Sequence, residues 1–275
     1  QFVELKGHQL PIGTLAFSPD SRWLASGSGG LFHPNQPGEL KLWDVSAARL
    51  SRDLPGHTLR INTVTFACDS RRLISTGADN TVRAWDVATG QPVPGLVPPE
   101  VEGLWMVASP TERVVAAGSG ATVRLLDLDT GRLIHAWSNH AHTVWGAAFS
   151  RDGRRLATGG SDNLVFIHDV AQGQIMAVLP MANVVSAVAF SPDGATLACG
   201  TIDKVTLWDV ARRREFGAIR GLKGGAICLD FTPDGSTLAV SAESQAPQLW
   251  DVRQVIAGGH VWKCESNGVQ ALAIS

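Results

Sequence analysis

The chain contains 275 residues and carries a formal net charge of -2, with a hydrophobic content of 44%. This near-neutral balance gives no general attraction to nucleic acid or to an anionic membrane, so neither is expected as a partner. No apolar run approaches the roughly 18 to 20 residues that a membrane span needs. The 29 glycines and 14 prolines are typical of many short strands joined by tight turns.

Four cysteines lie far apart and show no paired spacing: Cys68, Cys199, Cys228 and Cys264. This pattern favours small buried thiols in a reducing compartment over a disulfide pair, and it predicts a cytoplasmic protein. Arginine outnumbers lysine 18 to 5 and tyrosine is absent, a bias that suggests a G+C-rich, bacterial genome.

A tightly spaced repeat organises the chain. The aspartates of a closing Trp-Asp pair, or of its variants, are 42, 41, 42, 40 and 42 residues apart, at positions 44, 86, 127, 169, 209 and 251. A second phrase, Phe-Ser-Pro-Asp or a variant, recurs at 17–20, 66–69, 149–152, 190–193 and 231–234, with a degenerate copy at 108–111. A period this constant over six copies indicates a repeat architecture.

The first repeat carries the clear insertion of the chain, between Ser28 and Glu39. The inserted loop contains Phe32 and His33 between two prolines. A long loop of this kind is either a binding element or a neutral insertion at a tolerant surface, and we count Phe32 and His33 as candidate partner-binding residues.

The second repeat shows the strand pattern most clearly. Residues 61–66 are apolar and β-branched, runs at 72–76 and 81–85 follow after turns, and a more variable fourth run covers 91–96. Short runs bounded by Gly, Asp, Asn and Pro are strand signals, and no segment shows a sustained helical period. Four strands in about 40 residues predict one blade, and blades packed radially make a β-propeller.

The remaining repeats keep this order, the third being the most degenerate, with Leu126 in place of tryptophan. Residues 1–6 match the last strand of a preceding blade, and 268–275 match the first strand of a following one. A propeller closes by letting one terminus complete the blade of the other. We therefore expect a single all-β propeller domain over 1–275, cut from a longer chain. Seven four-stranded antiparallel blades are expected, the seventh incomplete, with six as the alternative.

These motifs resemble the WD-repeat (tryptophan-aspartate repeat) β-propeller family over essentially the whole chain. Gly-His at 7–8 and 56–57, Phe-Ser-Pro-Asp at 17–20 and the closing Lys-Leu-Trp-Asp at 41–44 recur in the family's order. The resemblance implies a hydrogen-bonded brace of His, Ser or Thr, Asp and Trp inside each blade. The residues that match it are His57, Ser75, Asp79 and Trp85, then His140, Thr158 and Asp162, and finally His8, Ser26 and Trp43.

The fourth repeat has His168 where the tryptophan belongs, and the long loop of the first leaves the place of its acid uncertain. A buried indole N–H, hydroxyl, imidazole and carboxylate need one another, because each left unpaired costs roughly 1 to 3 kcal/mol. A catalytic Ser-His-Asp set would instead face a cleft beside an oxyanion site. We expect no catalytic residue, no metal site and no cofactor. His140-Ala141-His142 has metal-like spacing, but His140 already belongs to a brace.

Five further residues are candidates for partner binding at the mouth of the expected channel: Arg60, Asn62, Trp105, Thr143 and Trp145. Aromatic residues and arginine are the usual interface anchors, although packing between blades explains the two tryptophans equally well. A second surface is a rim of arginines in the turns after the first strands: Arg22, Arg71, Arg72, Arg113, Arg154 and Arg155. These would bind an acidic or phosphorylated ligand, but acids in the same turns favour a mixed solvated rim.

By resemblance, the sequence predicts a non-catalytic protein-interaction scaffold that presents its faces to a protein or peptide, as a monomeric propeller. Similar bacterial chains are modules appended to signalling proteins, which makes a missing partner domain a hypothesis. The alternatives are a propeller-type hydrolase or lyase with its site at the channel mouth, and acidic-ligand recognition by the arginine rim. Fold alone does not dictate function.

Overall fold

The computed structural model describes residues 4–29, 36–94, 105–242, 245–257 and 262–263. The candidates Phe32 and His33, together with Cys264 and the segments 1–3 and 268–275, lie outside the described residues. The chain divides into two compact units, one formed chiefly by 1–119 with 123–136 and the other by 120–122 with 137–274.

The first unit contains three antiparallel sheets, named blades 1 to 3 in chain order. Blade 1 contains β1 Ile12–Phe17, β2 Trp23–Ser28, β3 Leu40–Asp44 and β4 Arg49–Asp53. Blade 2 contains β5 Ile61–Phe66, β6 Arg72–Gly77 and β7 Val82–Asp86. Blade 3 contains β8 Trp105–Ala108, β9 Val114–Ser119, β10 Thr122–Asp127 and β11 Leu133–Trp137.

The second unit contains blades 4 to 6. Blade 4 contains β12 Val144–Phe149, β13 Arg155–Gly160, β14 Leu164–Asp169 and β15 Ile175–Pro180. Blade 5 contains β16 Val185–Phe190, β17 Thr196–Thr201, β18 Lys204–Asp209 and β19 Arg214–Arg220. Blade 6 contains β20 Ala226–Phe231, β21 Thr237–Ala242, β22 Gln245–Asp251 and β23 Trp262–Lys263.

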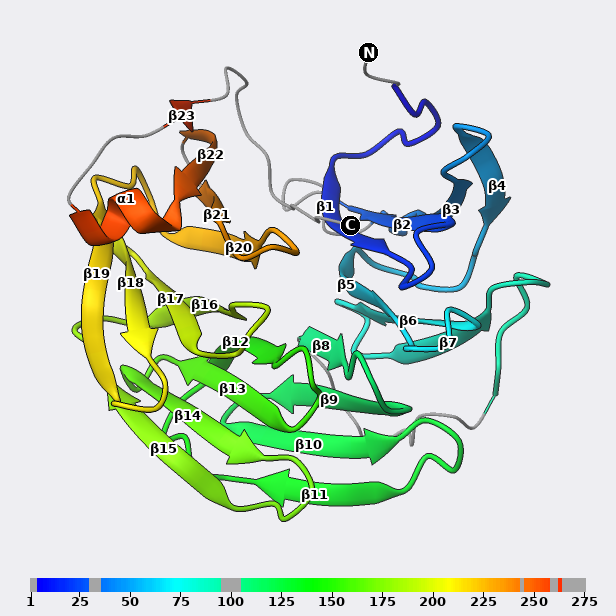
Figure 1. The fold of residues 1–275 in the computed structure, drawn as a ribbon. Helices are drawn as coiled ribbons and strands as arrows, with labels where there is room; N and C mark the ends of the chain where they lie inside the picture. The colour runs from blue at the N-terminus through cyan, green and yellow to red at the C-terminus, as the bar shows by residue number, and fades with distance from the viewer. Residues whose placement is uncertain (1–3, 30–35, 95–104, 243–244, 258–261, 264–275) are drawn as a thin grey trace. The chain divides into compact units, whose positions relative to one another are not determined.

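Within every sheet, each strand pairs with the one next in sequence, as Figure 1 shows. This is the up-and-down order of propeller blades, so the predicted fold class, an all-β propeller of four-stranded antiparallel blades, is confirmed. The described residues form six sheets, the number given as the alternative. In blade 2 an isolated bridge between Trp85 and Pro92 stands where the fourth strand was expected.

One short helix was not expected from the sequence. Helix α1 spans Val252–Ala257, directly after the closing aspartate of the last repeat. Asp251 Oδ1 accepts hydrogen bonds from the backbone N–H groups of Arg253 and Gln254, at 2.8 and 3.3 Å, which satisfies the helix start. Six residues are too few for a helical period to show in sequence. Among the helical segments described, none has the length and apolar character needed to cross a bilayer.

Apolar side chains fill the space between neighbouring blades of the same unit. One cluster joins Leu179 of blade 4 to Val188 of blade 5, and another joins Leu207 of blade 5 to Leu229 of blade 6. In the first unit, Leu42 of blade 1 belongs to the same cluster as residues of blade 2. Burial of this kind stabilises by about 25 cal/mol for each Å² of apolar surface removed from water.

A glycine in the second strand of three blades permits the close approach of the next blade. A Cβ at each would lie closer than 3.0 Å to the residue that begins the next blade's first strand: Gly27 meets Ile61, Gly159 meets Val185 and Gly200 meets Ala226. The absence of a side chain at these positions therefore sets how tightly successive blades pack.

We expect Gly159→Ala to lower the free energy of unfolding by about 1 to 3 kcal/mol, because its new methyl group would lie 2.4 Å from Val185 Cγ1. Gly217→Ala is the matched control, since a Cβ on this strand glycine would have its nearest neighbour at 3.5 Å. Urea unfolding of both variants measures the difference. Equal free energies for the two variants would contradict the proposed packing role.

Candidate functional site

Blade 2 contains a continuous chain of buried polar side chains. His57 Nδ1 lies 3.0 Å from Asp79 Oδ1, and His57 Nε2 lies 2.9 Å from Ser75 Oγ. Trp85 Nε1 donates to the same Ser75 Oγ at 3.0 Å. Ser75 is completely buried and Trp85 is only 1% exposed. The four residues singled out in this repeat are therefore joined to one another inside the sheet.

The donors and acceptors of this chain have one consistent assignment. Asp79 is an acceptor, so His57 donates from Nδ1 and its Nε2 accepts the Ser75 hydroxyl proton. The Ser75 oxygen then accepts the indole N–H of Trp85. Each of the three N–H and O–H groups that join these four side chains therefore donates to the next side chain. This leaves neither a free base nor an activated nucleophile.

Burial and hydrogen bonding shift the pKa values of this chain. Burial lowers the pKa of His57, while the neighbouring Asp79 opposes the shift. Burial alone would raise the pKa of Asp79, but hydrogen bonds from Thr58, Thr81 and His57 outweigh it and lower the pKa to about 2. The stable state is thus a neutral imidazole beside a carboxylate.

Blade 4 builds the same chain with a second histidine in place of tryptophan. His140 Nδ1 lies 2.9 Å from Asp162 Oδ2, and His140 Nε2 lies 3.0 Å from Thr158 Oγ1. On the far side of the hydroxyl, His168 Nε2 lies 3.0 Å from Thr158 Oγ1. By the same assignment, His168 Nε2 is a donor, as an indole N–H would be.

His168 differs from tryptophan in carrying a second ring nitrogen. Its Nδ1 is buried and has no hydrogen-bond partner among the described residues. Trp137 covers the ring, with centroids 4.6 Å apart. Burial, with a smaller electrostatic contribution from His140, lowers the pKa of His168 to about 4. The ring is therefore held neutral at physiological pH.

In blade 1 the carboxylate of the hydrogen-bonded brace comes from Glu39, whose position the insertion made uncertain in the sequence. His8 Nδ1 lies 2.9 Å from Glu39 Oε2, and His8 Nε2 lies 2.5 Å from Ser26 Oγ. Trp43 Nε1 donates to Ser26 Oγ at 2.7 Å. One feature of the sequence could have identified Glu39: it is the first acid after the inserted loop and immediately precedes β3.

Blades 5 and 6 contain the tryptophan but lack the hydrogen-bonded brace of histidine, hydroxyl and carboxylate. Trp208 Nε1 donates to Thr206 Oγ1 at 3.2 Å, and Trp250 Nε1 donates to Gln248 Oε1 at 3.0 Å. Each partner is two residues earlier on the same strand. The indole N–H is therefore satisfied locally, without an imidazole or a carboxylate.

The candidate partner-binding residues fall into two groups by exposure. Trp145 is 50% exposed, and its Nε1 donates to Ser161 Oγ at 2.6 Å. Arg60, Asn62 and Thr143 are half-buried beside the starts of β5 and β12. Trp105 is only 7% exposed, because its indole lies over Gly118, where a Cβ would be 2.1 Å from Trp105 Cε2. Trp105 is therefore a packing residue and is not presented at the surface.

A second exposed apolar residue, Ile202, lies near Trp145 in the fold. Ile202 is 56% exposed and follows β17, whose last residue, Thr201, pairs with Val185 at the start of β16. Strands β12 and β16 pack side by side, with a Cβ on Gly146 only 2.9 Å from Ala187 Cα. Trp145 and Ile202 thus lie at the same end of neighbouring blades.

The histidines and acids do not assemble into a metal centre in the described part of the chain, where no group of three or more candidate ligands occurs. His142 is exposed, whereas His140 faces Asp162 and Thr158 in its brace. The cysteines in the described ranges, Cys68, Cys199 and Cys228, form no disulfide bond.

Comparison with known proteins gives the family of these repeats. The model of the WD domain, G-beta repeat, matches residues 1–44, 48–86, 131–169 and 174–209, together more than half of the chain. The chain belongs to the WD40 repeat family. The matched ranges include the three blades that carry the complete polar chain and leave blade 6 unmatched.

Individual WD-repeat relatives match only in part. The guanine nucleotide-binding protein subunit beta of Zea mays is 30% identical over 115 residues, 39% of this chain and 30% of that protein. Autophagy-related protein 16 of Arabidopsis thaliana is 26% identical over 141 residues, 51% of this chain and 28% of that protein. WD repeat-containing protein 90 of Xenopus tropicalis is 25% identical over 185 residues, 67% of this chain and 10% of that protein. The chain spans less than a third of each relative's length.

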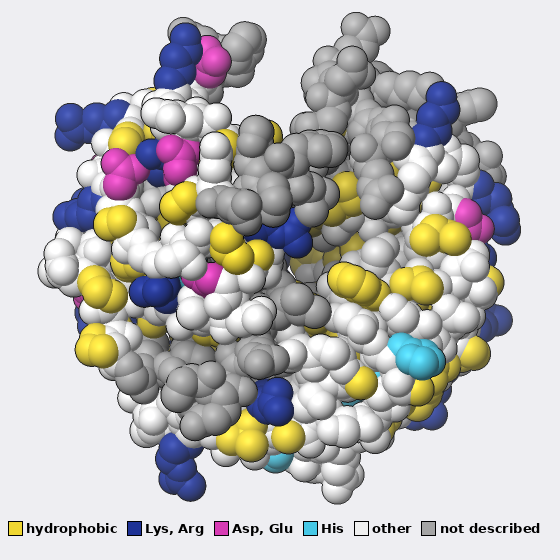
Figure 2. Space-filling view, turned by 180° about the vertical axis from the view of Figure 1, so that it is seen from behind, with side chains coloured by type: hydrophobic (Ala, Val, Ile, Leu, Met, Phe, Trp, Pro, Cys, Tyr) yellow, Lys and Arg dark blue, Asp and Glu magenta, His cyan; other side chains and the backbone are white. Residues whose placement is uncertain are grey.

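The arginines of the WD40 repeat turns are largely engaged with neighbouring groups. Arg113 pairs with Asp69 and Asp129 at 3.3 and 3.0 Å, and Arg72 reaches Asp129 at 3.2 Å. Arg22 lies over the ring of Trp23, 5.1 Å from its centroid. Figure 2 shows lysine and arginine side chains on the viewed face as separate groups, without a continuous basic patch. This arrangement matches the mixed, solvated rim weighed above.

We expect Ser75→Ala to lower the free energy of unfolding by about 2 to 4 kcal/mol, because it leaves His57 Nε2 and Trp85 Nε1 buried without a partner. The control is Ser241→Ala, an equally buried WD40 serine whose hydroxyl has no partner among the described residues. Because this hydroxyl is already unpaired, its removal should leave the free energy of unfolding unchanged or raise it. Urea unfolding compares the two, and similar losses would refute the role of the polar chain.

His168 should make the protein sensitive to mild acid. Its pKa is 6.5 when unfolded and about 4 when folded, so below pH 6.5 the unfolded chain binds a proton that the folded protein does not. Stability is therefore lost as the pH falls from 6.5 towards 4, by about 3 kcal/mol in total, and no such loss arises above pH 6.5.

The variant His168→Phe separates this titration from the hydrogen bond. At alkaline pH it should be less stable than wild type, since Thr158 loses a donor. Between pH 6.5 and 4, however, its stability should fall less steeply. Urea unfolding at several pH values gives both quantities, and identical slopes for the two proteins would disprove the assignment.

Proposed function

We propose that this chain is a non-catalytic scaffold that binds a protein or peptide partner. The observation that carries the proposal is the half-exposed Trp145, whose indole N–H is fixed by Ser161 while much of its ring faces solvent. A rigid aromatic residue of this kind loses little conformational freedom on binding, and tryptophan is enriched among the residues that contribute most to interfaces. Ile202 extends the apolar surface at the same end of the neighbouring blade.

The buried polar chains argue against the alternative of a propeller-type hydrolase or lyase. The Ser-His-Asp combination of blade 2 lies inside the sheet, with Ser75 completely buried and His57 only 4% exposed. Substrate cannot reach such a serine without opening the blade. The relatives' names are consistent with assembly, since a subunit of a guanine nucleotide-binding protein and a subunit of a target of rapamycin complex are among them.

Several finer statements belong to the same proposal. We infer a single, monomeric propeller domain over residues 1–275, attached to a longer, cytoplasmic signalling protein. The arginine-rich composition supports a bacterial gene, although the relatives named above are eukaryotic. The three cysteines of the described ranges, which form no disulfide bond, support a reducing compartment.

The proposal is tested by replacing Trp145 with alanine and comparing captured proteins by quantitative mass spectrometry. A genuine partner should be recovered at least about tenfold less with Trp145→Ala, the loss expected for a hot-spot tryptophan. Thermal stability should change little, because the ring is half exposed. Leu133→Ala is the control, since Leu133 is similarly exposed, at 52%, and belongs to β11 of blade 3.

If every captured protein is recovered equally by wild type, Trp145→Ala and Leu133→Ala, the Trp145 surface is not the binding site. Ile202→Ser supplies a second, independent variant of the same surface, because Ile202 is 56% exposed. Loss of the same protein with both variants is the expected result.

A further inference from the structure

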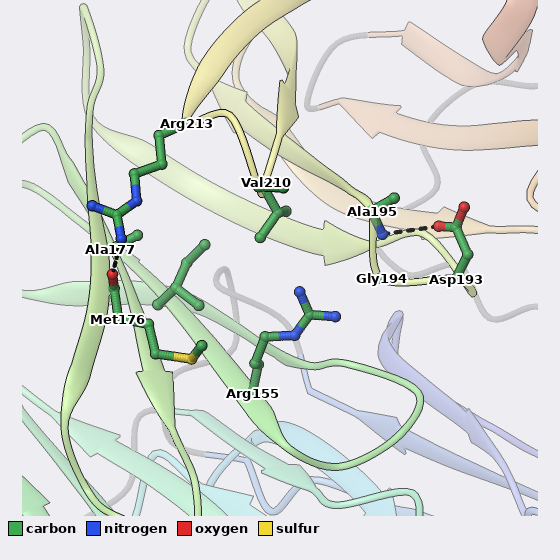
Figure 3. Close-up of a pocket in the computed structure, with 10 residues that line it drawn as sticks. Arg155, Met176, Ala177, Asp193, Gly194, Ala195, Val210 and Arg213 are labelled. Carbon is green, nitrogen blue, oxygen red and sulfur yellow. Dashed lines mark hydrogen bonds between the residues drawn. The ribbon is translucent and has the colours of Figure 1, made fainter.

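A pocket of about 370 Å³ lies between blades 4 and 5, both in the second unit. Strands β13 to β15 form one wall, and the turns between β16 and β17 and between β18 and β19 form the other. Figure 3 shows the side chain of Arg155, at the start of β13, pointing into this pocket. In the register of β13 and β14, Arg155 stands opposite Asp169, at the end of blade 4 remote from Trp145. The pocket is therefore separate from the surface proposed above.

The Arg155 guanidinium is held in place on two sides. It lies over the ring of Phe190, 5.3 Å from the centroid. On the other side is Gly194, where a Cβ would fall 2.1 Å from Arg155 Nη2, so the guanidinium occupies the space of a missing side chain. The positive φ of +65° at Gly194 adds a second reason for glycine there.

The neighbouring charged groups form hydrogen bonds to other atoms. Asp193 Oδ1 accepts hydrogen bonds from Ser191 Oγ at 2.6 Å and from the Ala195 N–H at 2.9 Å, the second of which Figure 3 shows. These hydrogen bonds, and to a smaller extent the charge of Arg155, lower the pKa of Asp193. Arg213 donates to the backbone oxygen of Met176 at 2.7 Å. In the described residues Arg155 has no ion pair, unlike Arg113.

Apolar groups surround this free guanidinium. Ile167, Met176, Ala177 and Val210 line the pocket, and Met176 is 45% exposed. Met176 belongs to β15, the outermost strand of its blade, which also exposes Ile175 and Val178. The β15 sequence, Ile-Met-Ala-Val-Leu-Pro, contains no charged residue, whereas the outer strands of blades 1 and 5 begin with arginine. Charge on an outer strand normally discourages pairing; β15 has none of its own, and blade 5 covers its edge at Met176, whose backbone oxygen accepts a hydrogen bond from Arg213.

We propose that this pocket binds an extended peptide segment in which an aspartate or glutamate precedes an aliphatic residue. The carboxylate accepts two hydrogen bonds from the planar guanidinium of Arg155, and the aliphatic side chain contacts Met176, Ile167 and Val210. The peptide lies across the mouth of the pocket, beside the exposed side chain of Met176. A flexible methionine at the entrance adapts to side chains of different shape.

The charge balance favours a carboxylate over a phosphate. A phosphate carries a charge of about -1.5 to -2 and is usually met by several arginines. The lining of this pocket contains two arginines, Arg155 and Arg213, and one acid, Asp193, which leaves a net charge of +1. A singly charged carboxylate matches this net charge, and the apolar part of the lining suits an uncharged neighbour.

The test uses the whole chain and a fluorescein-labelled peptide, Gly-Ser-Asp-Leu-Ser-Gly, measured by fluorescence anisotropy. Replacing its Asp by Asn, or its Leu by Ser, should each weaken binding. In the protein, Arg155→Met should weaken binding about tenfold or more, because a charge-assisted bidentate pair is lost. Arg154→Met removes the same charge from the exposed neighbouring residue and should change the affinity less than about twofold.

Two further variants keep the test decisive if Arg155→Met fails to fold. Arg155→Lys retains the charge without the fork of donors and should bind more weakly than wild type. Met176→Ser should reduce the preference for Leu over Ser in the peptide. The proposal is overturned by equal affinity for the Asp and Asn peptides, by no saturable binding at about 1 mM peptide, or by equal effects of Arg155→Met and Arg154→Met.

A phosphoserine peptide of otherwise identical sequence forms the last arm of the experiment. Tighter binding of phosphoserine than of aspartate would replace the carboxylate assignment with a phosphate site. Loss of this pocket as a binding site leaves the Trp145 surface untouched, because Arg155 and Trp145 lie at opposite ends of blade 4.

Discussion

The buried imidazole is the constraint on which blades 1, 2 and 4 depend. A histidine inside a sheet must find one acceptor and one donor for its two nitrogens, or the fold loses the free energy of an unpaired polar group. In each of these blades a carboxylate lies on one side of the ring and a hydroxyl on the other. The hydroxyl in turn receives an N–H from the third strand, so one chain ties a loop and two strands together.

Blades 5 and 6 lack this hydrogen-bonded brace and show what replaces it. In blades 5 and 6, Cys199 and Val240 occupy the strand position of the hydroxyl, and the indole turns to a residue of its own strand. The apolar clusters between blades are present in both cases. Apolar packing between neighbouring sheets therefore stabilises blades 5 and 6, where the hydrogen-bonded brace inside the blade is absent.

The sequence predicted the repeat and most strands closely. The run expected at 61–66 is β5, the run expected at 72–76 ends one residue before β6 does, and the run expected at 81–85 is shifted by one residue from β7. Periodicity and turn residues were sufficient for this, because each strand is bounded by a turn. Glu39 was not found, since the insertion changed the spacing that identifies Asp79 and Asp162 in the other blades. The sequence left Trp105 open between packing and partner binding, because its burial depends on Gly118 in a different strand.

The contact between Gly159 and Val185 has a consequence for how such a protein can grow. Blade 5 carries both halves of the match, with Val185 facing the preceding blade and Gly200 facing the following one. A gene duplication that copies this repeat therefore copies a recess together with a residue of the kind that fills one. The copied Val185 would meet the recess at Gly200, which Ala226 fills now, so the larger valine side chain is what the joint between parent and copy has to accommodate.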